Sequence, residues 1–238
     1  MSKAFDFIVL ENIDSTNSYL KRKIKAGEIA ADTAVLAKSQ TNGRGRLQRN
    51  WEAEKGKSLT VSIALKCPPN PSLTLLCALG VFEALDDILG DKNLRIKWPN
   101  DLVHKGKKLC GILCERASDF TVIGIGINAN NRIFPEEIKE KATSLTLLTG
   151  REYDIESLSK SVCEKVVNTL EKHRFALDEN ARDKYKSLCI NLGKEVHFGS
   201  PLKKGIAEDI SPLGELVVAT ESGYENVSFG DVFVSGIY

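Results

Sequence analysis

The sequence is short of the features that mark metal sites and disulfide scaffolds. Its six cysteines and three histidines are scattered along 238 residues, and no two cysteines form a CxxC pair. This spacing does not fit a structural zinc site. Most of the cysteines lie inside apolar segments such as "LTLLCALG" and "KLCGILCE". We therefore interpret them as small buried residues of a protein from a reducing compartment.

Long apolar runs and an excess of one charge are also missing. No stretch approaches the roughly 20 apolar residues of a membrane span, and the N-terminus, "MSKAFDFIVLENIDS", lacks the long apolar region of a signal peptide. We expect a cytoplasmic protein. The 33 basic and 32 acidic residues give a net charge of +1. Proteins that bind nucleic acid through its phosphates usually have a clear basic surplus, so any basic site must be local.

The pattern of apolar residues, helix caps and glycines predicts two domains. Strands are predicted where apolar residues alternate or run together, at 5–13, 33–40, 58–66, 94–98, 102–115 (a hairpin) and 119–130. Helices are predicted from apolar spacing, caps and closing glycines, at about 14–27, 72–90 and 155–177. Short strands between glycine turns at 191–238 are typical of a small β-barrel. We therefore expect one domain at 1–190 and a second at 191–238.

The segment "NGRGRLQRNW", residues 42–51, alternates arginine with glycine. Glycines let the backbone approach a ligand closely, and guanidinium groups bind carboxylate and phosphate oxygens through paired hydrogen bonds. Trp51 could stack on a flat ring. The segment fits a loop that binds an anion. On these residues alone, a solvated basic hairpin with a half-buried tryptophan remains the alternative.

The segment "KWPND" places Lys97 and Asp101 on either side of a rigid Trp98-Pro99 break. An amide and a carboxylate are therefore held at fixed positions on a turn between strands. A carboxylate beside arginines is a reasonable partner for Mg²⁺ or a ribose at a nucleotide site. A plain turn stabilised by its Asn-Asp pair is the alternative.

The hairpin strand "KKLCGILCE" carries a lysine at its start. Strict alternation puts Lys108 on the same face as Cys110 and Ile112, with Gly111 on the opposite face. A lysine that enters a sheet could point into a polar cleft. Without other information, we interpret Lys108 as an edge lysine whose ammonium group reaches solvent.

The strand "VIGIGINAN" places its isoleucines on one face and Gly124, Gly126 and Asn128 on the other. Glycines in the middle of a strand weaken it unless something lies against them. The isoleucines belong to a core, and the glycine face fits a flat ligand that lies on the sheet. A helix that crosses closely over the glycines is the alternative.

The segment "DSTN", at the start of the first predicted helix, offers hydroxyl and backbone N–H groups. These groups suit a small polar head group or an anion. Taken alone, simple helix capping explains them better.

These motifs occur in one order: STN, Q-x-x-GRGR-x-x-R-x-W, KWPND, KL-x-GIL-x-E, GIGIN and the small terminal barrel. Each is weak singly, but the ordered set over nearly the whole chain is specific. It resembles the biotin protein ligases, also called biotin–[acetyl-CoA-carboxylase] ligases. The resemblance is to the short form without an N-terminal DNA-binding domain.

The resemblance implies an α+β fold: a mixed sheet with packed helices, related to class II aminoacyl-tRNA synthetases, plus a C-terminal SH3-like small β-barrel. It implies that biotin and Mg·ATP form biotinyl-5′-AMP and pyrophosphate. A lysine of a biotin carboxyl carrier domain then attacks this intermediate and releases AMP. No DNA or membrane binding is expected, and a homodimer is left open.

The resemblance also assigns site residues by motif. The biotin site would comprise Ser15, Thr16, Asn17, Gln40, Gly43, Arg44, Arg46, Lys108 and Gly111. The ATP and adenylate site would comprise Arg44, Arg46, Arg49, Trp51, Asn100, Asp101, Lys108 and Asn128. The catalytic residues would be Lys108, Arg46 and Asp101, with Asp101 also meeting the Mg²⁺ that accompanies ATP. Lys108 would stabilise charge near the α-phosphate, which reverses its interpretation as an edge lysine.

One departure from the resemblance lies in the arginine loop. The family loop usually has Arg-Gly where this sequence has Leu47-Gln48. One cation and one flexible residue are therefore replaced, while Arg44, Arg46 and Arg49 remain. We expect adenylation to be intact and loop closure to be altered, which would show as leakage of biotinyl-AMP.

Three other readings are separable by experiment. A lipoate ligase would share the fold and reaction logic, but GRGR and KWPND argue against it. A non-catalytic biotin sensor is disfavoured because Lys108, Asp101 and Asn128 are retained beside the loop. A nucleic-acid-binding module is disfavoured by the net charge of +1.

Overall fold

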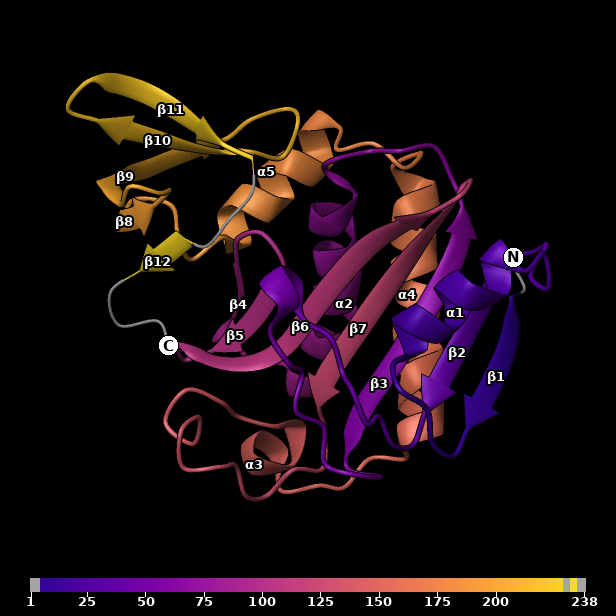
Figure 1. Ribbon diagram of the computed structural model, residues 1–238. Coiled ribbons are helices and arrows are strands. Elements are labelled where there is room, and N and C mark those ends of the chain that lie inside the picture. The colour runs from indigo at the N-terminus through magenta and orange to yellow at the C-terminus, as the bar shows by residue number, and fades with distance from the viewer. Residues whose placement is uncertain (1–4, 229–231, 235–238) are drawn as a thin grey trace.

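The computed structural model describes residues 5–228 and 232–234. Its centre is a seven-stranded mixed sheet in which only the β1–β2 pair is parallel among the described pairings. The strands lie in the order β1-β2-β3-β7-β6-β5-β4 (Figure 1). Their bounds are β1 Asp6–Leu10, β2 Thr33–Ala37, β3 Ser58–Lys66, β4 Leu94–Lys97, β5 Asp101–His104, β6 Lys107–Ala117 and β7 Phe120–Asn128.

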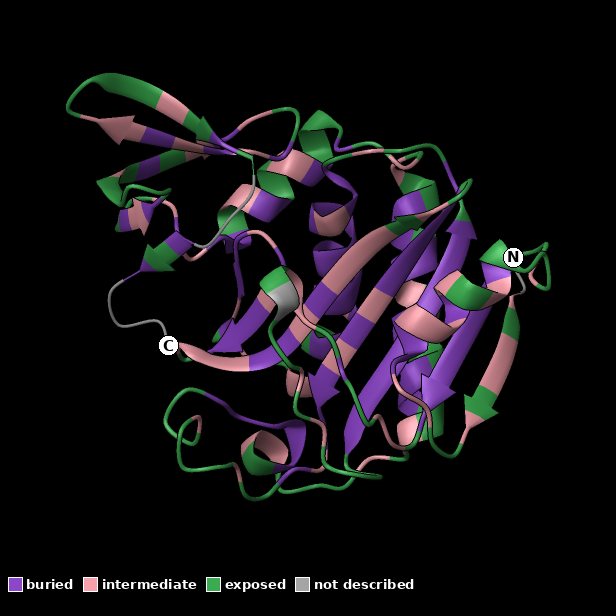
Figure 2. Cartoon of the chain, in the orientation of Figure 1, coloured by how far each residue is buried: buried purple, intermediate pink, exposed green. Residues whose placement is uncertain are grey.

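Helices cover the two faces of this sheet unequally. The long helices α2 (Leu73–Leu89) and α4 (Ile155–Lys172) pack behind it in the view of Figure 1, and α1 (Thr16–Lys25) packs on the other face. Gly80 brings α2 and α4 together, since a Cβ there would lie 2.7 Å from the Cα of Val166. The strand centres and the sheet-facing sides of α2 and α4 are buried (Figure 2). The face that carries α1 is therefore the one with room for a ligand beside the helix.

A second, five-stranded antiparallel sheet follows in the chain, as predicted for the small terminal barrel. Its order is β11-β10-β9-β8-β12. The strands are β8 Glu195–Phe198, β9 Lys203–Ile210, β10 Leu216–Thr220, β11 Gly223–Val227 and β12 Val232–Val234. Trp98, just after β4, joins it to the main sheet, because its Nε1 donates to the carbonyl of Gly214 at 2.9 Å; the segment that leads to the second sheet is held by the backbone N–H of Ile190, which donates to the carbonyl of Ile96 at 2.8 Å.

Three helical segments differ from the sequence prediction. The helix predicted to reach residue 177 ends at Lys172, because Arg174 and Phe175 take positive φ values of 50° and 58°. The short helix α3 (Leu145–Thr149) and the helix α5 (Glu179–Leu188) were not predicted. α5 was missed although its buried residues Ala181, Tyr185 and Leu188 lie at helical spacing and Asp178 caps it by accepting from the N–H of Ala181.

None of the helices in the described part of the chain is long and apolar enough to span a membrane.

Candidate active site

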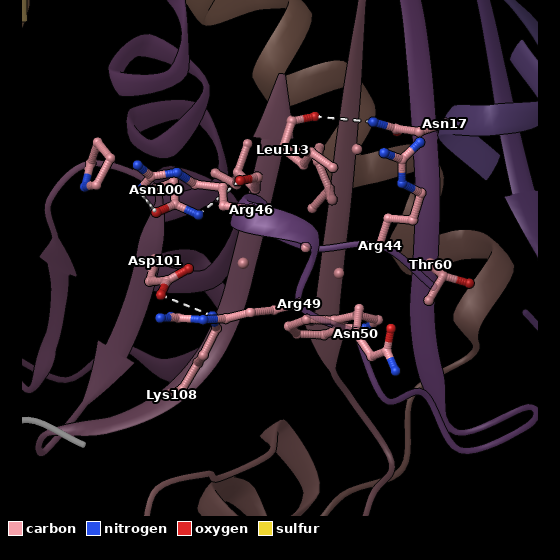
Figure 3. A pocket seen from close by; sticks show the side chains of 18 of the residues that line it. Asn17, Arg44, Arg46, Arg49, Asn50, Thr60, Asn100, Asp101, Lys108 and Leu113 are labelled. Atoms are coloured by element: carbon pink, nitrogen blue, oxygen red, sulfur yellow. Dashed lines mark hydrogen bonds and ion pairs between the residues drawn. The ribbon is translucent and has the colours of Figure 1, made fainter. Parts of the chain in front are cut away.

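A cavity of about 340 Å³ opens on the sheet face that α1 shares. Most of its wall comes from the start of α1, the arginine loop, the turn between β4 and β5, and the facing parts of β6 and β7 (Figure 3). The cavity collects most of the residues that the sequence singled out, namely Ser15, Thr16, Asn17, Gln40, Arg44, Arg46, Arg49, Trp51, Asn100, Asp101, Lys108 and Gly111. Motifs separated by up to about a hundred positions thus meet at one site.

One end of the cavity is built on the start of α1. Ser15 caps the helix, as predicted: its φ of −159° is extended and its hydroxyl accepts from the N–H of Ser18. The side-chain oxygen of Gln40 accepts from the backbone N–H of Thr16 at 2.8 Å. Capping and ligand binding are therefore not exclusive here, because Thr16 is held by the helix start and still lines the cavity.

The glycine face of β7 is covered by two different groups. A Cβ on Gly126 would lie 2.4 Å from Cε2 of Trp51, so the indole packs directly on that glycine. A Cβ on Gly124 would lie 2.4 Å from Oδ1 of Asn17, which belongs to α1. A flat ring therefore does lie on this face at Gly126, but it is the chain's own, and a helix does approach closely at Gly124.

Lys108 lies in the cavity, and the strict alternation predicted for its strand is wrong at this point. The β5–β6 pairing shifts register: Leu102 pairs with Cys110 and Val103 pairs with Lys108, so Leu109 is an extra residue. Such a bulge turns the preceding side chain to the other face. Lys108 consequently lies with Gly111, whose Cβ would be 3.2 Å from Lys108 Cε, while Cys110 is buried in the core.

The bulge brings Lys108 to a carboxylate. Its Nζ donates to Oδ2 of Asp101 at 2.8 Å and lies 5.7 Å from the ring centre of Trp51 (Figure 3). The side chains are 28% and 14% exposed, so the pair is partly shielded from water. A cation in such a setting keeps more of its electrostatic effect on a bound anion than one in bulk water.

The arginine loop is tied to the cavity wall from two sides. Arg46 begins a short 3₁₀ turn, Arg46–Gln48, and its Nη1 donates to Oδ1 of Asn100 at 3.0 Å. Asn100 in turn donates to the carbonyl of Ile112 at 2.9 Å. Arg44 lies 3.9 Å from the carboxylate of Glu115. The loop thus presents guanidinium groups to the cavity from positions set by the sheet.

Two predicted site residues do not line the cavity. Gly43 lies behind the wall, where a Cβ would approach the carbonyl oxygen of Trp51 to 2.4 Å. Asn128 is buried, and its amide donates to the carbonyls of Thr143 at 3.0 Å and Lys108 at 3.4 Å. Gly43 therefore allows the close return of the loop at Trp51, and Asn128 supports the start of β6.

Sequence reasoning missed several residues of the wall. They come from strand interiors, from the turn before α3 and from β12, and they are Thr60, Leu113, Lys141, Val232 and Phe233. Thr60 and Leu113 look like ordinary strand residues. The contribution of β12 depends on how the second sheet docks against the first, for which the local sequence carries no signal.

Among the described residues, no group of three or more His, Cys, Asp or Glu side chains is placed to hold a metal ion. The cavity wall contributes the carboxylate of Asp101, which already accepts from Lys108. A magnesium ion there would need most of its oxygen ligands from a bound nucleotide and water, which is how this ion usually binds at phosphate sites.

Comparison with known proteins points to one family. Residues 9–130 match the biotin/lipoate A/B protein ligase family, and residues 192–235 match the biotin protein ligase C-terminal domain. The biotin–[acetyl-CoA-carboxylase] ligase of Mycobacterium tuberculosis is 30% identical over 94% of this chain and 87% of its own. The biotin–[acetyl-CoA-carboxylase] ligase of Paracoccus denitrificans is 27% identical over 96% of this chain and 100% of its own. The Aquifex aeolicus biotin protein ligase, solved with biotin and ATP, superposes with a TM-score of 0.86 at 33% identity, covering 96% of this chain and 98% of that one.

Proposed function

The chain belongs to the biotin protein ligase family, and we propose that it is a biotin–[acetyl-CoA-carboxylase] ligase acting at the cavity beside α1. In the first step the biotin carboxylate attacks the α-phosphorus of ATP, which forms biotinyl-5′-AMP and releases pyrophosphate. In the second, a lysine amine of a biotin carboxyl carrier domain attacks the acyl carbon, which forms an amide and releases AMP.

One observation carries this proposal: the cavity has two chemically different ends. The end at Thr16 and Gln40 offers hydroxyl and amide donors and acceptors, which suit a neutral polar ring, and the cation beside it, Arg44, faces the carboxylate of Glu115. The other end gathers Lys108, Arg46 and Arg49, which suit phosphate and carboxylate oxygens. A ligand that joins a neutral head group to an acyl phosphate matches both ends.

In the first step the residues of the chain align the reactants and neutralise charge. Lys108 would stabilise charge that develops on the α-phosphate, and its contact with Asp101 holds the ammonium in place. Arg46, fixed by Asn100, would neutralise a second oxygen. Mg²⁺ supplied with ATP would neutralise phosphate charge, with Asp101 as the residue that could meet it.

The second step needs an unprotonated amine. Asp101 is the candidate base, because its carboxylate lies beside Lys108 at the phosphate end of the cavity. We expect Asp101→Asn to slow transfer from preformed biotinyl-AMP more than Asn100→Ala does. Equal slowing by the two variants would argue for a purely positional role of Asp101.

The expected partners follow from this reaction. They are biotin, ATP and a biotin carboxyl carrier domain, in the cytoplasm, where six free cysteines are compatible with a reducing environment. With a net charge of +1 we expect no salt-sensitive binding to DNA. A homodimer is compatible with the proposal, and it is tested by the mass of the protein in solution.

The test is to mix the protein with biotin, Mg·ATP and a carrier domain and to weigh the carrier by mass spectrometry. We expect a mass gain of one biotin that is lost in Lys108→Ala and Arg46→Ala. Lys107→Ala is the matched control, because Lys107 is the adjacent lysine and instead lies 3.6 Å from Glu140 outside the cavity. Transfer of lipoate in place of biotin, or biotin binding without pyrophosphate release, would overturn the proposal.

A further inference from the structure

A second cavity, of about 560 Å³, lies between α1 and the end of the β6–β7 hairpin, and it shares no lining residue with the first. Its volume falls in the range of small-molecule sites. None of the described residues that line it is acidic. Its polar wall consists of four cations and two hydroxyls, namely Lys21, Arg22, Lys25, Arg116, Ser18 and Ser118.

Two of the four cations are neutralised by acids outside the cavity wall. The guanidinium of Arg22 donates to both carboxylate oxygens of Asp14, at 2.6 and 2.9 Å. Lys21 Nζ lies 2.7 Å from Oε1 of Glu115. These acids offset charge without occupying the cavity, so an anion there would be attracted mainly by the other two cations.

Lys25 and Arg116 form no ion pair with any residue in the described part of the chain. The acid nearest to Arg116 along the hairpin, Asp119, is paired with Lys66 at 3.0 Å, and Lys66 lies outside the cavity wall. The two unpaired cations face the cavity from opposite sides, one from α1 and one from β6. The cavity therefore carries an excess of positive charge in a chain whose net charge is only +1.

Arg116 is held in place before any ligand arrives. Its Nη1 donates to the carbonyl of Cys67 at 2.7 Å and to Oγ1 of Thr121 at 3.1 Å. Its Nε and Nη2 have no acceptor among the described residues and are left to donate as a pair. A guanidinium that is already anchored loses less conformational freedom when it binds the two oxygens of a phosphate.

We propose that this second cavity binds a small anion that carries two or more phosphate charges, with Arg116 and Lys25 as its main ligands. The hydroxyls of Ser18 and Ser118 add donors on the two walls. A tetrahedral phosphate directs oxygens toward both walls at once, which a planar carboxylate does less well. The inference is independent of the ligase reaction, because the two cavities have separate walls.

The test is calorimetric titration with inorganic pyrophosphate, the probe that stands for this class of anion. The variant Arg46→Ala/Lys108→Ala serves as the background, since it removes cations of the first cavity and leaves the second intact. We expect one equivalent of pyrophosphate to bind, and inorganic phosphate to bind about tenfold weaker because it forms fewer charged hydrogen bonds. Should this background not fold, titration of the wild type should show an equivalent that the substitutions below remove.

Substitutions in the wall identify the site. We expect Arg116→Gln to weaken pyrophosphate binding about tenfold or more, and the exposed Lys25→Gln to weaken it severalfold. Lys23→Gln is the matched control, because it removes the same charge from the same helix, while Lys23 pairs with Glu28 outside the cavity wall. Should Arg116→Gln not fold, Arg116→Lys keeps the charge but loses the paired N–H groups, and we expect a severalfold loss.

Three results would overturn the proposal. The first is no binding of pyrophosphate in a folded background variant. The second is an equal loss in Lys23→Gln and Lys25→Gln, which would show general attraction by the charge of α1 in place of a site. The third is binding to vesicles of an anionic phospholipid without binding to pyrophosphate, which would identify a membrane-facing surface. None of these results bears on the ligase activity, which is tested separately by the mass of the carrier.

Discussion

Trp51 packs directly on Gly126: a Cβ added to that glycine would lie 2.4 Å from Cε2 and 2.6 Å from Cζ2 of the indole. The indole Nε1 is buried and has no hydrogen-bond partner among the residues that the structure describes. The ring therefore covers the floor of the cavity. A flat ligand ring must stack on the opposite side of the indole or displace it.

We predict that Gly126→Ala displaces the indole and weakens ATP binding by about tenfold, because a contact of 2.4 Å cannot be relieved without moving the ring. Titration of ATP, followed by calorimetry and by tryptophan fluorescence, would measure both effects. In a Trp51→Ala background, Gly126→Ala should cause almost no further loss of ATP affinity. An equal loss in both backgrounds would mean that the methyl group acts on something other than Trp51.

The sequence predicted this region well where the chemistry is local. The arginine loop, the turn after Lys97 and the glycine face of β7 were each identified from residue types and spacing, and the structure places them around one cavity. The glycines in mid-strand predicted a flat ligand on the sheet, with a closely crossing helix as the alternative; the structure places the chain's own indole at Gly126 and a residue of α1 at Gly124. Sequence reasoning could not identify that indole as Trp51, because two separate strands and a loop have to meet first.

The features that sequence reasoning missed each depend on how separate segments pack together. Lys108 was assigned to the wrong face because alternation assumes a regular strand, and the extra residue Leu109 is visible only in the pairing with β5. Ser62, whose hydroxyl lies 2.6 Å from Oγ1 of Thr16 and from Oδ1 of Asn17, gave no signal, since one serine in "SLTVSIALK" looks like any strand residue until α1 is placed over it. The contribution of β12 to the cavity wall likewise depends on the packing of two sheets.

We predict that the contact between Arg46 and Asn100 retains biotinyl-AMP. Its length is 3.0 Å, and Leu47 in the same turn has a φ of 52°, a conformation that costs a residue with a side chain about 1–2 kcal/mol. Arg46→Ala and Asn100→Ala should each raise the fraction of intermediate that escapes before transfer, and the double variant should be little worse than either. Independent effects that multiply would rule out a shared role.

That fraction is measured by chromatography of biotinyl-AMP released in the absence and presence of carrier. Leu47→Gly provides a test of the loop itself, because glycine adopts a positive φ without the steric cost. We expect it to reduce escape relative to the wild-type loop. An increase would mean that flexibility in the open loop outweighs the relief of strain.

We predict that Glu115 contributes to stability in a pH-dependent way. Its pKa is lowered overall in the folded protein, so its contribution is present above the unfolded value of about 4.3 and is lost as the pH falls through the folded value. The difference in Tm between wild type and Glu115→Gln should therefore be larger at neutral pH than in acid. A difference that stays constant or grows on acidification would contradict the ion pair with Lys21.

The last prediction concerns Trp98, which joins the two sheets. Its Nε1 donates to the carbonyl of Gly214 at 2.9 Å, and its backbone N–H donates to Oδ1 of Asn191 at 2.8 Å, while Tyr185 donates to the carbonyl of Pro99 at 3.3 Å. The side chain thus fastens the second sheet, whereas the backbone contacts position the turn that carries Asp101. The two roles are separable by substitution.

Trp98→Phe should destabilise the protein by about 1–3 kcal/mol, since it leaves the Gly214 carbonyl without its donor, and should leave kcat nearly unchanged. Asn191→Ala should lower both stability and kcat, because it frees the backbone just before Asn100 and Asp101. Urea unfolding and the adenylation rate, measured on both variants, distinguish the cases. If kcat fell equally in Trp98→Phe and Asn191→Ala, docking of the second sheet, and not the Asn191 contact alone, would place Asp101 against Lys108.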